Sequence, residues 1–140
     1  MDSDLKRELI LENYKNPFNK GLKDDKEYVS LNKSSQTCID NFDIQVLIKD
    51  NVIEDIRYDG EACAIATSSM SISTSILIGK TKEEALNIID NYEKMIDEKE
   101  YDKDLLEELN IYEDIYKQPS RVKCATLGIE GIKELIKNAK

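Results

Sequence analysis

The pattern of hydrophobic and polar positions predicts an α+β fold, in which a strand-rich part is followed by helices. Over residues 42–48 apolar side chains alternate with polar ones, the period of a strand with one buried face. Asp50-Asn51 predicts a hairpin turn, and residues 52–58 its return strand. With a further short strand at 28–31, we expect a small antiparallel three-stranded sheet within residues 27–58, with helices packed on one face.

Helical patterns occupy most of the remaining chain. Thr81 to Glu84 has the pattern of a capping box, and Gly79 suits the C′ position of the preceding helix. That preceding helix is rich in serine and threonine, which are weak helix formers, so we expect tertiary packing to hold it near the middle of the fold. Residues 32–40 and 110–119 are predicted to be loops. Ser3 and Ser120 are predicted to cap the first and the last helix, and further helices are predicted to begin at or next to Cys63, Thr81 and Leu105.

Length and charge limit the possible classes of protein. A chain of 140 residues is expected to form one domain, residues 1–140, with a real hydrophobic core. Its net charge of −9 argues against binding to nucleic acid or to an anionic membrane, because both need a basic surface. The start of the chain lacks the pattern of a signal peptide, and no apolar run approaches the roughly 18 residues of a membrane span. We therefore expect a cytoplasmic protein.

Cysteine is the residue type that carries the candidate chemistry. The sequence contains three cysteines and no histidine, which excludes Cys–His nucleophiles and metal sites with histidine ligands. In a reducing compartment an odd number of cysteines is not expected to form structural disulfides. The three thiols are therefore core residues, metal ligands or reactive groups.

The predicted elements place these cysteines in related positions. Cys63 follows a strand and a glycine and begins a helix, where free backbone N–H groups favour a thiolate, although plain packing also explains such a cysteine. Cys124 is predicted to lie in the first turn of the last helix. Cys38 lies in a loop, and Asp40 follows two residues later.

Three thiolates and a carboxylate form a ligand set suited to a tetrahedral metal site. Sulfur-rich ligation favours zinc or an iron–sulfur cluster over magnesium or calcium. Cys38, Cys63 and Cys124 are nevertheless far apart in the sequence, and their spacing matches no local zinc-finger pattern. Spacing alone therefore leaves a shared site open.

Several longer motifs, spread over nearly the whole chain, support a shared site. They are Asn16-Pro17-Phe18-Asn19-Lys20-Gly21, residues 51–60, Cys63-Ala64-Ile65-Ala66 with the serine run after it, Gly79-Lys80-Thr81 and Arg121-Val122-Lys123-Cys124-Ala125-Thr126-Leu127. Together they resemble the SufU proteins of the IscU/NifU N-terminal family of iron–sulfur cluster assembly. An inserted stretch within residues 90–115, and Lys123 where IscU-type proteins carry histidine, favour SufU over IscU.

The resemblance implies a SufE/NifU-like, IscU-type fold and a specific chemistry. Cys38 would accept persulfide sulfur from a SufS-type cysteine desulfurase and pass it toward a SufBCD-type scaffold. Arg121 matches an arginine of the family motif and would contact the partner or orient Asp40, although a solvated role explains it equally well. For Lys123 we expect a surface role. The zinc ligands implied are Cys38, Asp40, Cys63 and Cys124.

Two departures from the family pattern and two alternative functions accompany this hypothesis. The chain has Cys38-Ile39-Asp40 where the family has Cys-Gly-Asp, and Ala62 replaces a glycine before Cys63, so we expect a loop of altered shape or stiffness. The first alternative is a scaffold that binds iron and assembles a [2Fe–2S] cluster on the same four residues. The second is a non-catalytic acidic interaction module with three incidental thiols.

Overall fold

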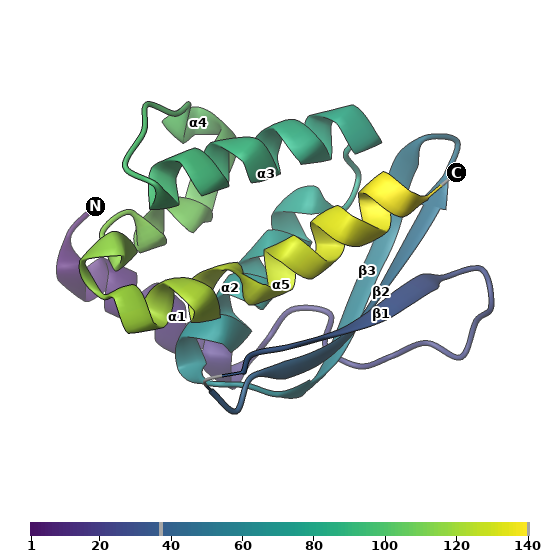
Figure 1. The fold of residues 1–140 in the computed structure, drawn as a ribbon, viewed down its shortest axis with the longest axis horizontal. Helices are drawn as coiled ribbons and strands as arrows, with labels where there is room; N and C mark the ends of the chain where they lie inside the picture. Colours follow the sequence, from purple (N-terminus) through teal and green to yellow (C-terminus); the bar gives the residue numbers. More distant parts are fainter. Residues whose placement is uncertain (37, 140) are drawn as a thin grey trace.

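The computed structural model, which describes residues 1–36 and 38–139, contains the predicted three-stranded sheet (Figure 1). Its strands are β1 (Val29–Ser34), β2 (Asn41–Lys49) and β3 (Val52–Glu61), paired antiparallel in the order β1-β2-β3. The alternating pattern correctly predicted which face is buried. The predicted loop 32–40 is wrong at its start, because β1 continues to Ser34, which pairs with Asn41.

The helices lie on one face of this sheet, as predicted. Figure 1 shows α2 and α5 on the same side of the sheet, with α3 beyond them. The predicted loop 110–119 is largely helical, since short 3₁₀ helices occupy it. The helices are α1 (Ser3–Lys15), α2 (Ala64–Leu77), α3 (Lys82–Ile96), α4 (Lys103–Leu106), η1 (Glu107–Tyr112), η2 (Ile115–Lys117) and α5 (Pro119–Asn138).

The helix ends confirm two predicted caps and correct two others. Thr81 and Glu84 form the reciprocal capping box, and Gly79 has the positive φ of +90° that a C′ residue adopts. Asp2, not Ser3, caps α1, because its carboxylate accepts the N–H groups of the first turn. The prediction of Ser120 as the last N-cap is also wrong: α5 already begins at Pro119, whose fixed φ suits the first helical position.

α2 lies at the centre of the fold, as its composition predicted. It is buried along nearly its whole length, and several of its serines donate to carbonyls one turn earlier within the helix. Gly128 of α5 faces it so closely that a Cβ there would lie 2.3 Å from Met70 Sδ. Small residues therefore allow the close approach of α2 and α5.

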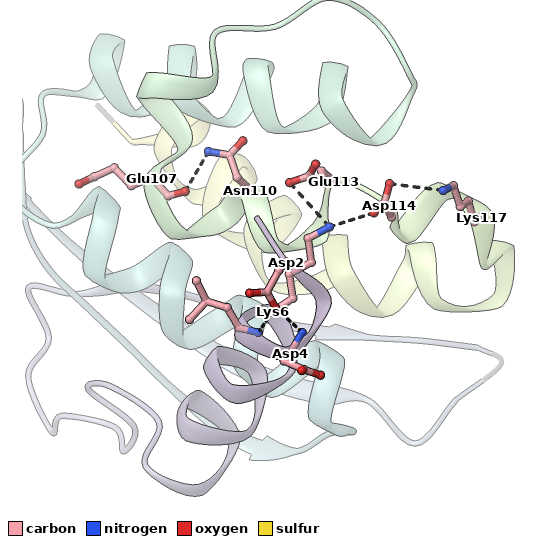
Figure 2. A network of polar contacts seen from close by, with 9 residues as sticks. Asp2, Asp4, Lys6, Glu107, Asn110, Glu113, Asp114 and Lys117 are labelled. Carbon is pink, nitrogen blue, oxygen red and sulfur yellow. Dashed lines mark hydrogen bonds and ion pairs between the residues drawn. The ribbon is translucent and has the colours of Figure 1, made fainter.

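The segment between α3 and α5, residues 97–118, is called the connecting segment below. Its outer side is held to α1 by ion pairs, which Figure 2 shows around Lys6. Lys6 Nζ lies 2.9 Å from an Asp114 carboxylate oxygen and 3.8 Å from one of Glu113. Because these side chains are only partly buried, each pair is expected to contribute less than about 1 kcal/mol. Packing must supply most of the stability of this segment.

The backbone near the end of β3, three residues before Cys63, requires glycine at position 60. Its φ is +138°, and a Cβ would lie 1.9 Å from the Asn41 carbonyl oxygen in the neighbouring strand. We expect Gly60→Ala to lower the free energy of unfolding by about 2 kcal/mol or more, because it adds a backbone clash to conformational strain. Gly79→Ala, where a Cβ meets nothing within 4 Å, is the matched control for strain alone. Equal losses for the two variants in urea unfolding would contradict the role of the clash.

Candidate metal centre

The four predicted residues meet at one end of the sheet. Cys38 and Asp40 lie in the β1–β2 connection, Cys63 precedes α2, and Cys124 lies in α5. One ligand atom from each lies within 4.8 Å of the others, so a single ion would be within reach of all four. The fold thus brings together residues that are up to 86 positions apart in the sequence, counting from Cys38 to Cys124. These residues are called the four-residue cluster below.

Asp40 connects the loop to the start of α2. Its carboxylate is buried, with 1% of the residue exposed, and Oδ1 accepts the Cys63 N–H at 2.8 Å. Its backbone carbonyl accepts the Ser35 N–H at 2.9 Å, which closes the loop. Sequence reasoning identified Asp40 as a candidate ligand and missed the hydrogen bond that its carboxylate accepts from the Cys63 N–H. The available signal for this hydrogen bond was the predicted position of Cys63 at the start of a helix, because the first residues of a helix have free backbone N–H groups.

Cys63 has the position predicted for it. It is the N-cap of α2, and its Sγ accepts the Ala66 N–H at 3.4 Å. A backbone N–H group of the first turn of α2 therefore points at this sulfur. The remaining Asp40 oxygen, Oδ2, lies 3.8 Å from the same sulfur.

Cys124 differs from its prediction. Since α5 begins at Pro119, Cys124 lies in the second turn rather than the first. It is therefore not next to the free backbone N–H groups at the start of the helix. It is almost fully buried, and this burial is the largest cause that raises the pKa of its thiol. The neighbouring Asp40 and Cys63 raise that pKa further. Without a metal ion this residue is therefore a neutral thiol at physiological pH.

Cys38 lies in the loop part of the cluster, between β1 and β2. It is half-buried, and the neighbouring Ile39 is 70% exposed. Neither Ile39 nor Ala62 has a positive φ, so the replacement of family glycines at these positions introduces no backbone strain. Ile39 places an exposed apolar side chain beside Cys38.

Arg121 and Lys123 both lie on the surface beside the cluster. Within residues 1–36 and 38–139, the Arg121 guanidinium makes no hydrogen bond or ion pair. The possible role in orienting Asp40 therefore has no contact to support it. Lys123 lines an open surface groove together with Lys33 and Glu130, consistent with the predicted surface role.

The donor set of the cluster fits a thiophilic divalent cation. Three sulfur atoms and a carboxylate match the ligands of structural and exchangeable zinc sites. No lysine or arginine in the described part of the chain forms an ion pair with Asp40, although a buried carboxylate needs compensating charge. A bound cation would supply that charge and keep the thiols deprotonated.

Zinc is expected to stabilise the folded protein, and magnesium is not. An ion that binds only the folded state at 100 times its dissociation constant adds about 2.7 kcal/mol to the free energy of unfolding. Magnesium prefers oxygen ligands and leaves the melting temperature unchanged. Thermal unfolding of metal-free protein with each ion provides the test. Equal effects of the two ions would contradict a sulfur-based site.

Fold and cluster together define a class of protein: an α+β domain with a candidate metal centre of three cysteines and one aspartate. The model of the NifU-like N terminal domain matches residues 5–138. The chain therefore belongs to the NifU-like N-terminal domain family of iron–sulfur cluster assembly.

Individual relatives agree with this assignment. The chain is 34% identical to the zinc-dependent sulfurtransferase SufU of Bacillus subtilis over 131 residues, covering 93% of this chain and 88% of that protein. It is 36% identical to the iron–sulfur cluster assembly scaffold protein IscU of Streptococcus pyogenes over 132 residues, covering 94% and 82%. The crystal structure of the SUF-system protein FiSufU from Fervidobacterium islandicum superposes with a TM-score of 0.81 at 28% identity, covering 92% and 94%. The predicted IscU-type α+β fold is thus confirmed.

The helices of the described residues do not have the character of membrane spans. None combines the length and apolar character that a lipid bilayer requires of a spanning helix.

Proposed function

We propose that this protein is a zinc-dependent sulfur carrier that accepts persulfide sulfur from a cysteine desulfurase. The observation that carries the proposal is the unequal setting of the three thiols. Cys63 and Cys124 are held by helices, whereas Cys38 lies in the β1–β2 connection, next to the exposed Ile39. A thiol that must leave the metal and meet a partner is best placed in such a loop. The relationship to SufU of B. subtilis, named a zinc-dependent sulfurtransferase, supports the same function.

The transfer step follows ordinary thiol chemistry. Bound zinc would keep the Cys38 sulfur deprotonated at neutral pH. The Cys38 thiolate attacks the terminal sulfur of the partner's cysteine persulfide, whose S–S bond breaks as a new S–S bond forms on Cys38. The partner's cysteine leaves as a thiolate, so no external oxidant or reductant is required. Cys38 then carries the persulfide.

The surface next to Cys38 offers room for an approaching partner. An open groove of about 320 Å³ lies beside the loop and is lined by Tyr14, Ile39, Ala62 and neighbouring side chains. Tyr14 and Ile39 are both exposed, so the groove presents apolar groups to an approaching partner. A SufS-type desulfurase is the proposed donor and a SufBCD-type scaffold the proposed acceptor, both in the cytoplasm. Arg121, which is exposed and has no partner among the described residues, is available to contact the donor.

A second function, assembly of a [2Fe–2S] cluster, uses the same ligands. The relationship to IscU of S. pyogenes, named a scaffold protein, favours it. A non-catalytic acidic module explains less, because it gives no reason for a buried Asp40 to lie among three thiols.

Metal analysis of the purified protein distinguishes these functions. About one zinc per chain, with sulfur transferred from a desulfurase supplied with cysteine, is the result expected of a sulfur carrier. Iron with acid-labile sulfide, delivered to an apo-protein acceptor, would favour the scaffold. Protein that binds no metal, even after reconstitution, would overturn both.

A further inference from the structure

Two buried tyrosines contact the two helices that bring Cys63 and Cys124 into the four-residue cluster. Tyr112 is the last residue of η1 in the connecting segment, and Tyr92 belongs to α3. Their exposed fractions are 1% and 0%, and their rings meet edge to face, with centroids 6.3 Å apart and an interplanar angle of 89°. The two rings therefore form one packed unit between the connecting segment and the helices of the cluster.

Tyr112 contacts the helix that begins at Cys63. Its hydroxyl lies 2.5 Å from Ser68 Oγ, and Ser68 Oγ also lies 3.1 Å from the Ile65 carbonyl. A serine hydroxyl has one proton, which it donates to that carbonyl, so Tyr112 is the donor of the shorter bond. The chain of bonds ends at Ile65, two residues after Cys63.

Tyr92 makes the corresponding contact with the other helix. Its hydroxyl donates to the Ala125 carbonyl at 2.7 Å, and Ala125 directly follows Cys124. Burial raises the pKa of both phenols, so both retain the proton that they donate. Each tyrosine is thus bonded close to one helix-borne cysteine, and the rings fix the two contacts relative to each other.

We infer that Tyr112 and Tyr92 are positioning residues of the metal centre, which clamp α2 and α5 so that the Cys63 and Cys124 sulfurs are held at ligand spacing. The inference rests on the proposed function, because it assumes a metal at the cluster. It also gives the connecting segment a specific role, since that segment supplies Tyr112. Within residues 1–36 and 38–139, no tyrosine makes a contact of this kind beside Cys38, which is therefore the ligand held by a loop alone.

The test measures metal affinity directly, by competition with a chromophoric chelator, for zinc and for cobalt(II). We expect Tyr112→Phe to weaken binding of both ions about 10-fold, the lower end of the loss seen when groups behind metal ligands are removed. The visible absorption bands of bound cobalt should also change, because the sulfur positions change. Tyr58→Phe is the matched control: Tyr58 is equally buried, and its hydroxyl donates to the Phe18 carbonyl at 2.6 Å. That variant should bind both ions within about 2-fold of the wild type, since its hydroxyl lies outside the clamp.

Ser68→Ala removes the other partner of the same hydrogen bond. If the bond acts as inferred, this variant weakens metal binding as Tyr112→Phe does, and the double variant is no weaker than the worse single one. Additive losses would overturn the clamp. So would wild-type affinity and spectrum in Tyr112→Phe, or an equal loss in Tyr58→Phe. Wild-type protein that binds neither ion would overturn the proposed function together with the clamp, whereas normal wild-type binding with an unaffected Tyr112→Phe overturns the clamp alone.

Discussion

Cys38→Ala is expected to fold normally and to accept no sulfur from the desulfurase above background. The thiol of Cys38 is the proposed acceptor, and neither of the other two cysteines is placed to replace it. Cys63 is fixed at the cap of α2, and Cys124 is almost fully buried. Because Cys38 is only half-buried, its truncation should cost less than the roughly 2–5 kcal/mol of a large core truncation. Loss of transfer would then reflect lost chemistry rather than unfolding.

The measurement follows sulfur-labelled cysteine through the desulfurase to the carrier, with detection of persulfide on intact protein by mass spectrometry. Cys124→Ala is the informative control, because it keeps the acceptor thiol and removes a candidate ligand. Under the proposed mechanism it retains some persulfide formation on Cys38, although zinc binding is impaired. Label on Cys38→Ala at the wild-type rate would show that another thiol accepts the sulfur.

The elements that could be predicted are those with local causes. The β2–β3 hairpin follows from alternation and from Asn51, which adopts the positive φ that its side chain tolerates. The capping box at Thr81 is likewise contained within four residues. Caps failed where a competing residue stood next to the predicted one: Asp2 beside Ser3, and Pro119 beside Ser120. A propensity for capping does not decide between adjacent candidates.

The sequence could predict which residues belong to the cluster, but not how deeply they are buried or what they contact. The absence of histidine and the family resemblance selected the four side chains that the fold brings together. The place of Cys124 within the helix depends on where α5 begins, and the earlier start at Pro119 moved the thiol from the predicted first turn to the second. The bond from Tyr112 to Ser68 joins residues 44 positions apart and follows only from the packing of the connecting segment. Long-range contacts of this kind leave no periodic signal in the sequence.

Asp40→Ala should have the largest effect on the metal centre, because it removes two functions at once. The variant loses a candidate ligand, and the loss of zinc affinity should exceed the roughly 10–100-fold typical of groups behind the ligands. It also leaves the Cys63 N–H without its acceptor, which is expected to lower the stability of the metal-free protein by about 1–3 kcal/mol.

Asp40→Asn separates these two functions. Its amide oxygen can still accept the Cys63 N–H, but it carries no charge and is a poorer zinc ligand. We therefore expect near-normal stability in the metal-free form, with zinc affinity reduced nearly as much as in Asp40→Ala. Urea unfolding without metal and chelator competition with zinc measure the two quantities independently. If Asp40→Ala bound zinc as tightly as the wild type, the carboxylate would be a structural acceptor only. The site would then hold its ion through three cysteines and a ligand from solvent or from a partner.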